Sequence, residues 1–267
     1  MFQVEHYPSE NSHGWLVCQF ELFRLDDSFL VEKYVPRPDV SLIFHFGNVP
    51  FVINDKEVML KPFFATPIIT KSLMLKLQGR MDTFVVVCKP TVLSRIFELD
   101  FSVSGQVIEL PQGIFNPLWK QLARTENIQL RIQLFSDFID DFHRKTYHPD
   151  TIDLLYDKIL ECSITKSLSY LLQECPACER TLQRSFKRRT GVSPKTLARI
   201  VRIDYLWSKI INENAIDYQE LVFDGKYFDQ AHFINDFKSI IGETPSYFFN
   251  RNQNILKLIS GRKPGQY

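Results

Sequence analysis

Six polar side chains in the second half of the chain are spaced as on one exposed face of a helix. They are Arg180, Thr181, Gln183, Arg184, Lys187 and Arg188. An arginine can bridge two acceptors of guanine and a glutamine can pair with adenine, while outer lysines and arginines suit phosphates. A solvated charged face is the alternative, but Glu179 is the only acid nearby to balance these charges. Nine basic residues against two acidic ones between positions 175 and 210 favour a phosphate backbone as the partner.

The element that must hold these side chains is repeated. Residues 186–194 (FKRRTGVSP) return as residues 237–245 (FKSIIGETP) at a constant offset of 51. Each copy reads as a short helix, a turn, and a second helix that ends at a glycine and is followed by a Ser/Thr cap and proline. One such motif alone could join any two helices. Two copies at one offset predict two tandem helix-turn-helix units.

The second copy is less basic than the first. Its outward residues are expected to be Gln230, Ala231, His232, Asn235 and Lys238. Phe233 and Phe237 would anchor its inner face, so this helix should make fewer phosphate contacts than the first.

A long helix over 194–212 should join the two units. At about 1.5 Å per residue it would span roughly 27 Å, near the ~34 Å between major grooves on one face of DNA. The apolar residues expected to pack against both units are Leu197, Ile200, Val201, Ile203, Leu206, Ile210 and Ile211. A support helix over 152–162 should turn Leu154, Leu155 and Ile159 inward, and the scaffold helix of the first unit should bury Leu171.

The first half is rich in β-branched and aromatic residues broken by turn signals. Strands are predicted over 15–23, 29–35, 41–46, 51–53, 57–60, 73–77 and 83–88, with a hairpin turn at 54–56. Seven short strands favour a mainly-β sandwich or small barrel. Helical periodicity follows at 91–99 and again over 116–142.

Aromatic side chains could line the mouth of this barrel and hold a small-molecule effector. The candidate pocket residues are Trp15, Tyr34, Phe44, His45, Phe46 and Phe64. The alternative is that they simply fill the core. His45 stands apart from the other histidines, so an iron oxygenase is discounted and no metal site is expected.

An apolar stripe follows the barrel with the spacing of a two-helix seam. It comprises Ile128, Ile132, Phe135, Ile139 and Phe142. It could pack against the barrel of its own chain or pair with the same helix of a second subunit. A homodimer through Ile128, Ile132, Phe135 and Ile139 therefore remains open.

Composition supports two domains in a chain of 267 residues that is 45% hydrophobic. The first 150 residues carry a net charge of −3 and the remainder +4. Five cysteines, no leader peptide and no apolar run long enough for a membrane lead us to expect a cytoplasmic protein without disulfides. Cys175 and Cys178 have Cys-x-x-Cys spacing but no second ligand pair, so their role is structural or a thiol switch. We expect no cofactor and no catalytic residues.

The second half resembles the AraC/XylS family of bacterial transcription regulators. The resemblance lies in ERTLQRSFK at 179–187, GVSPK at 191–195, DQAHF at 229–233, Phe237-Lys238, and GETP at 242–245. The first half is similar to the cupin-like sensor domains of that family, most clearly where Pro38-Asp39 leads into 41–46. Departures are Pro176 and Lys226 at positions where the family commonly has a turn glycine, and Cys178 in place of a serine cap.

The resemblance implies a cupin-like sensor and dimerisation domain at 1–145 and an all-α DNA-binding domain at 150–258. It implies binding to promoter DNA and activation through RNA polymerase. Carried over by position, the base readers are Arg180, Thr181, Gln183 and Arg184, then Gln230, Ala231 and Asn235. Two alternatives remain open. One is a metal- or ligand-binding cupin-type enzyme tethered to DNA, and the other is a DNA-binding protein without an effector.

Overall fold

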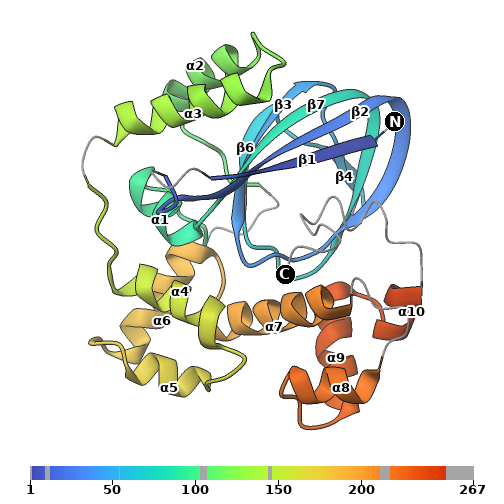
Figure 1. Ribbon diagram of the computed structural model, residues 1–267, viewed down its shortest axis with the longest axis vertical. Helices are drawn as coiled ribbons and strands as arrows, with labels where there is room; N and C mark the ends of the chain where they lie inside the picture. Colours follow the sequence, from blue (N-terminus) through green and yellow to red (C-terminus); the bar gives the residue numbers. More distant parts are fainter. Residues whose placement is uncertain are drawn as a thin grey trace.

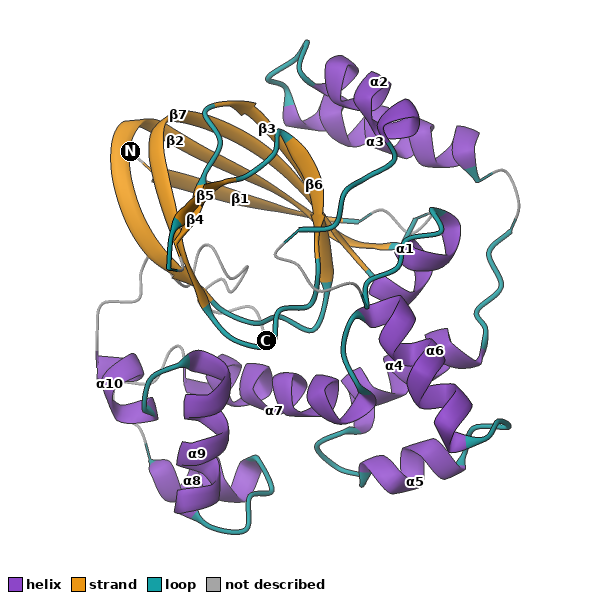
Figure 2. Cartoon of the chain, turned by 180° about the vertical axis from the view of Figure 1, so that it is seen from behind, coloured by secondary structure: helices purple, strands orange, loops and turns teal. Residues whose placement is uncertain are grey.

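The fold was obtained as a computed structural model that describes residues 2–9, 13–53, 55–102, 107–143, 146–210 and 217–250. The first half is an antiparallel sheet that curls into a barrel, and the second half is a row of helices beneath it (Figures 1 and 2). Among the described residues, no helix has both the length and the apolar character needed to cross a bilayer.

Seven strands form the sheet: β1 (Phe2–Pro8), β2 (Val17–Tyr34), β3 (Val40–Gly47), β4 (Phe51–Ile53), β5 (Glu57–Met59), β6 (Phe63–Thr66) and β7 (Leu73–Cys88). Their order is β1-β2-β7-β3-β6, and β4 pairs with β5 and β7. The long strands β2 and β7 bend together at a register shift between Leu25 and Ser28, where Gly79 has a φ of +76°. Bulges of this kind let a sheet curl.

The predicted strands were right in place but too fragmented. Each of two predicted pairs, 15–23 with 29–35 and 73–77 with 83–88, is one continuous strand, β2 and β7. Two strands, β1 and β6, were missed. The predicted turn at 54–56 includes Asn54, which lies outside the described residues.

Side chains alternate between the two faces of the sheet, as strand geometry requires. On β3, Leu42 and Phe44 face the helices, whereas Ser41, Ile43 and His45 face the barrel interior. The outer face is covered by α1 (Pro90–Ile96), α2 (Gln112–Leu122) and α3 (Ile128–Phe142) (Figure 2). The predicted helix over 116–142 is thus two helices, α2 and α3.

The apolar stripe of α3 packs on its own chain. Phe135 and Ile139 are buried, and the ring of Phe135 meets that of Phe20 on β2 edge-on, with centroids 6.0 Å apart. Arg131 is also buried on this helix, in a bidentate pair with Asp82 at 2.9 and 2.7 Å. The contacts that Phe135 and Ile139 make within the chain account for their place in the stripe without a second subunit.

The second half contains α4 (Thr151–Cys162), α5 (Leu168–Gln173), α6 (Glu179–Thr190), α7 (Pro194–Ile210), α8 (Tyr218–Asp224), α9 (Gln230–Ile241) and α10 (Pro245–Asn250). Two helix-turn-helix units, α5-α6 and α8-α9, lie at opposite ends of the long helix α7 (Figure 1). This is the arrangement predicted from the repeat. In α4, Leu155 and Ile159 face inward as predicted, but Leu154 is exposed and Tyr156 is buried instead.

Apolar packing divides the chain differently from the secondary structure. One core runs without a break from the outer face of the barrel through α1 to α3 into α4, α6 and the first half of α7. The second unit has a core of its own, built on Ile203, Leu206 and Trp207 of α7. This core also includes Val35, the residue that follows the barrel strand β2. Helix α7 therefore belongs to both cores, as its apolar spacing predicted, although Ile211 lies outside the described residues.

Candidate nucleic-acid interface and barrel cavity

Helix α6 of the first unit buries Leu182 and Phe186 and leaves its polar face in solvent. The exposed side chains include all six that the sequence singled out: Arg180, Thr181, Gln183, Arg184, Lys187 and Arg188. Gln183 donates a 2.8 Å hydrogen bond to Glu179 one turn earlier, so its amide must leave that partner to read a base. Arg188 lies 3.9 Å from Asp100, a long and exposed ion pair.

Both ends of α6 follow from the local sequence. Gly191 closes the helix in the left-handed conformation at φ +84°, and a Cβ there would lie 2.8 Å from the Phe101 carbonyl. At the start, Cys178 occupies the N-cap position but makes no side-chain hydrogen bond to the helix. The cap that serine supplies in the resembling family is thus missing here.

Helix α9 of the second unit has the same design. Asp229 caps it by accepting a 2.7 Å hydrogen bond from the amide of His232, and Gly242 closes it at φ +84°. Phe233 and Phe237 are buried. The predicted outward residues are all exposed, namely Gln230, Ala231, His232, Asn235 and Lys238. The ring of His232 packs edge-on against Tyr227, with centroids 5.1 Å apart.

The turn of the second unit keeps its shape without glycine at the usual place. Lys226 takes the left-handed conformation at φ +52°, and its ammonium lies 4.5 Å from the centre of the Phe223 ring. Gly225, one residue earlier, is needed for a different reason. A Cβ there would lie 2.7 Å from the Tyr227 ring and 2.9 Å from Leu206.

An ion pair and hydrogen bonds connect α9 to α7. Arg199 of α7 donates to Asp236 at 2.6 Å and to Ser239 at 2.6 Å, and the hydroxyl of Tyr227 donates to the other oxygen of Asp236 at 2.8 Å. The side chain of Arg202 lies 5.0 Å from the centre of the Tyr227 ring. The sequence predicted only apolar packing for α7, and the i, i+3 spacing of Arg199 and Arg202 was the available signal for this charged contact.

Arg189 faces inward although it belongs to the basic run of α6. It donates to the Thr91 carbonyl of α1 at 2.7 Å and to both oxygens of Asp150 at 2.7 and 2.6 Å. Asp153 also accepts from it. Burial opposes ionisation of Asp150, but Arg189 outweighs it and holds the pKa of Asp150 below its usual value. Arg189 thus fastens the first unit to the rest of the chain. Its three-residue spacing from Phe186 could have revealed this.

The first half of the chain caps the C-terminal ends of both candidate reading helices. The amide of Phe101 donates to the Arg188 carbonyl of α6 at 2.9 Å. On α9, the amide of Ser72 donates to the Ile240 carbonyl at 2.9 Å, and the ammonium of Lys33 donates to the Ile241 carbonyl at 3.2 Å. Carbonyls at a helix end have no partner within the helix, so these bonds tie both helices to the barrel half.

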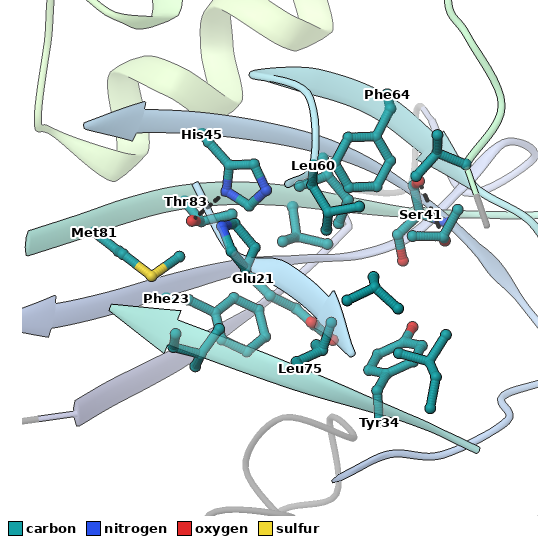
Figure 3. Close-up of a pocket in the computed structure, with 18 of the residues that line it drawn as sticks. Glu21, Phe23, Tyr34, Ser41, His45, Leu60, Phe64, Leu75, Met81 and Thr83 are labelled. Carbon is teal, nitrogen blue, oxygen red and sulfur yellow. Dashed lines mark hydrogen bonds between the residues drawn. The ribbon is translucent and has the colours of Figure 1, made fainter. Parts of the chain in front are cut away.

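The barrel interior contains a partly open cavity of about 120 Å³ (Figure 3). Of the six candidate pocket residues, Tyr34, His45 and Phe64 line it. Trp15, Phe44 and Phe46 do not, which corrects the expectation. Phe44 and Phe46 lie on the outer face of β3, where Phe46 stacks with Trp119, and Trp15 stacks on Tyr147 with centroids 5.0 Å apart.

The polar part of the cavity was not foreseen. Glu21, almost wholly buried, accepts from Arg37 at 3.1 Å, and Arg37 also pairs with Asp39 at 3.1 Å. Burial opposes ionisation of Glu21, but the charge of Arg37 prevails and keeps the pKa of Glu21 below normal. His45 Nδ1 lies 2.8 Å from the Thr83 hydroxyl. Burial alone lowers the pKa of His45 to about 3, so the ring is neutral at pH 7.

The five cysteines are free thiols. The Sγ atom of Cys175 lies 3.5 Å from the Leu171 carbonyl, to which it donates, and burial raises its pKa. A raised pKa keeps this sulfur in the weakly reactive thiol form at neutral pH. Within the described part of the chain, no three His, Cys, Asp or Glu side chains come together in a way that could hold a metal ion.

Comparison with known proteins identifies the helical region. Residues 173–251 match the family model described as "Helix-turn-helix domain". No curated protein matches the chain in sequence.

Among solved structures, the chain is similar to ToxT from Vibrio cholerae at 13% identity, with 92% of this chain and 97% of that chain covered and a TM-score of 0.44. Unsaturated fatty acid bound wild-type ToxT from Vibrio cholerae strain SCE256 is 12% identical, with 98% of each chain covered and a TM-score of 0.46. The AraC-like transcriptional activator CuxR is 10% identical, with 88% and 80% covered and a TM-score of 0.23.

The matched residues span the whole of α6, α7, α8 and α9, so the sequence match and the geometry of the two units agree. The C-terminal region of this chain is a helix-turn-helix domain of the AraC type, the DNA-binding part of a transcription regulator.

Proposed function

We propose that the chain is a sequence-specific regulator that places α6 and α9 in successive major grooves of promoter DNA and responds to an effector held in the barrel. One observation carries the DNA-binding part. Both helices bury their apolar faces in cores that share α7 and leave mainly polar side chains on the opposite faces. With 17 residues, α7 is about 26 Å long, which suits two reading helices about one turn of DNA apart.

Different side chains take different roles in this proposal. Arg180, Gln183 and Arg184 of α6 read base edges, with Thr181, and Lys187 and Arg188 contact phosphates. On α9, Gln230, Ala231 and Asn235 read bases, with weaker support from His232 and Lys238. The second helix carries one lysine where the first carries several cations, so α6 supplies more of the affinity.

The effector part of the proposal rests on the way the cavity meets the second unit. Tyr34 and Leu73 line the cavity and are paired at the ends of β2 and β7. Their chain neighbours Lys33 and Ser72 are the two residues that cap α9. A molecule that shifts Tyr34 or Leu73 therefore acts directly on the cap of a reading helix. A barrel packed solid would have favoured a regulator without an effector, and the cavity argues against that.

The remaining assignments belong to the same proposal. We assign residues 1–145 to the sensor and 150–258 to DNA binding, of which 251–258 lie outside the described residues. RNA polymerase is the proposed partner at the promoter, and a homodimer would have to use a surface other than the buried side chains of Phe135 and Ile139. We propose no catalytic activity. A regulator of this kind acts in the cytoplasm, where bacterial DNA lies.

The test compares two exposed residues of α6. Operator sites are first found by footprinting on genomic DNA. Arg184→Ala should then weaken binding by about 1–3 kcal/mol and relax sequence preference. Lys187→Ala should weaken binding to all DNA sequences equally and reduce the slope of log binding constant against log salt concentration by about one. Lys195→Ala, on an exposed residue of α7, is the control. If both α6 variants behave alike, the division into base and phosphate contacts fails. If the wild type shows no sequence preference, the proposed function fails.

A further inference from the structure

His45 carries a buried polar atom that the fold leaves unused. The side chain is 4% exposed and lines the barrel cavity, and its Nε2 atom has no hydrogen-bonding partner within the described residues. Figure 3 shows one ring nitrogen bonded to Thr83 and the other turned toward the interior, on the side of Leu60 and Phe64. Leaving a buried polar group without a partner costs about 1–3 kcal/mol, so such an atom marks a place where a ligand can bind.

The direction of the bond to Thr83 decides whether Nε2 or Nδ1 carries the hydrogen of the neutral ring. If the Thr83 hydroxyl donates to Nδ1, the neutral ring keeps its hydrogen on Nε2, and one donor remains unsatisfied. If Nδ1 donates instead, both the hydroxyl hydrogen and the Nε2 lone pair lack partners among the described residues. The first arrangement leaves fewer buried groups unsatisfied. Nε2 is therefore a hydrogen-bond donor that faces the cavity.

The charges around the cavity are already matched. Arg37 is shared by two carboxylates, Glu21 and Asp39. Arg24, which also lines the cavity, donates to the Glu126 carbonyl at 2.8 Å and lies 3.9 Å from Asp82. Within the described lining, each guanidinium thus has an acidic or carbonyl partner, and a ligand carboxylate would meet Glu21 without a spare counterion. The cavity disfavours anions.

The remaining lining is mainly apolar, with the hydroxyl groups of Tyr34, Ser41 and Thr66, and it sets the size of the ligand. Side chains such as Phe23, Leu60, Leu75 and Met81 surround a space of about 120 Å³. An apolar cavity of roughly 150 Å³ can hold a benzene molecule. We infer that the cavity binds a neutral molecule about the size of one aromatic ring, whose oxygen accepts a hydrogen bond from His45 Nε2. This inference rests on the proposed role of the barrel as the effector site.

The first experiment measures the donor without any ligand. The full chain is labelled with ¹⁵N at its histidines, and the His45 signals are assigned by their loss in His45→Phe. The expected result is a neutral ring with the hydrogen on Nε2. A hydrogen on Nδ1 would overturn the inference.

The second experiment measures the ligand class with three probes of similar shape. Acetophenone offers a carbonyl, ethylbenzene offers no acceptor, and benzoate adds a charge. Isothermal titration of the full chain should show benzoate as the weakest of the three. The ratio of the acetophenone and ethylbenzene dissociation constants should shift about tenfold against acetophenone in His45→Phe. Met81→Leu, which changes only the apolar wall, should leave the ratio unchanged.

A rescue variant guards against damage to the fold. His45→Gln retains an amide donor and should restore part of the preference for acetophenone. An unchanged ratio in His45→Phe, binding of benzoate as tight as that of acetophenone, or no binding of any probe would each overturn the inference. DNA binding is measured on the same samples. If the protein binds its operator but none of the probes, this inference fails and the DNA-binding proposal stands. If it binds the probes but shows no operator recognition, the DNA-binding proposal fails instead.

Discussion

Lys33 of β2 donates a hydrogen bond to the backbone carbonyl of Ile241, 3.2 Å away at the C-terminal end of α9. The same ammonium pairs with Glu243 and is almost wholly buried. A helix end carries partial negative charge, so a cation there stabilises the helix more when water is excluded. A barrel residue thus supports the second candidate reading helix at its far end.

Replacing this lysine should loosen α9 selectively. Lys33→Met keeps the apolar stem and removes the charge, and we expect the second unit to lose about 1–3 kcal/mol because a charged hydrogen bond disappears from a buried site. Hydrogen exchange followed by mass spectrometry should show faster exchange of the α9 amides and little change in α6. Lys238→Met, an exposed lysine on α9 itself, is the matched control. Equal protection of α9 in both variants would contradict the prediction.

Arg189 should matter for stability rather than for DNA. Arg189→Ala leaves Asp150 and Asp153 without their guanidinium partner, and removal of one member of a mostly buried pair should cost about 3 kcal/mol. Its exposed neighbour provides the comparison. Arg188→Ala should change stability by under about 0.5 kcal/mol while weakening DNA binding. Urea unfolding checks the first effect and a salt series of binding titrations checks the second. The assignment fails if Arg188→Ala is the more destabilising change.

The buried His45 should make the protein sensitive to acid. Its pKa is about 3 in the folded chain against 6.5 for an ordinary histidine, so between these values only the unfolded chain binds the proton. Stability is therefore lost as pH falls below about 6.5, and by pH 5 the loss from this group should be about 2 kcal/mol.

The measurement is the free energy of unfolding of wild type and His45→Phe at pH 7.5 and pH 5. Other groups titrate equally in both proteins, so the difference between the two isolates His45. We expect the wild type to lose about 2 kcal/mol more than the variant over this interval. Parallel pH profiles would show that the ring is not held neutral.

The start of α6 can be improved. Cys178 has the extended backbone of an N-cap, with φ −59° and ψ 133°, but no side-chain hydrogen bond. Cys178→Ser should supply the missing acceptor and stabilise the first unit by about 1 kcal/mol. Asp229→Ala, which removes the cap of α9, should destabilise the second unit by a similar amount. Urea unfolding reads out both changes. A neutral effect at Cys178 combined with a loss at Asp229 would show that the first helix gains nothing from a cap.

Local signals made the helical half predictable. Gly191 and Gly242 take the left-handed conformation that ends a helix, and Ser193 caps the start of α7 through a 3.1 Å bond to Thr196. The helix period placed Leu182 and Phe233 inside and the polar residues outside. Such signals act within about four residues, so one sequence suffices to read them.

The barrel was harder because its determinants are distant in sequence. Strand β2 continues through the polar residues Asp26 and Asp27, which looked like a break, because β7 pairs with it on both sides of the register shift there. Aromatic composition could not tell which face of a strand a residue occupies. Phe44 and His45 were therefore assigned to one pocket although successive residues point to opposite faces.

Charged contacts between residues distant in sequence were equally hard to predict. Arg189 and Asp150 are 39 positions apart, and Lys33 and Glu243 are 210 apart. Nothing in the local pattern of either residue names its partner. Only the spacing of Arg189 from Phe186 indicated that this cation belonged to the buried face of α6.

The continuous core between barrel and first unit bears on how such a protein can be cut or recombined. If the helical half were produced alone, Leu155, Phe186 and Leu197 would lose apolar contacts of the shared core. The fragment would then expose an apolar patch and tend to aggregate. A foreign sensor joined to this half would pack well only if its outer face were redesigned to fit α4 and α6, the helices on which α1 packs. The second unit, with its separate core, is the piece that tolerates exchange more readily.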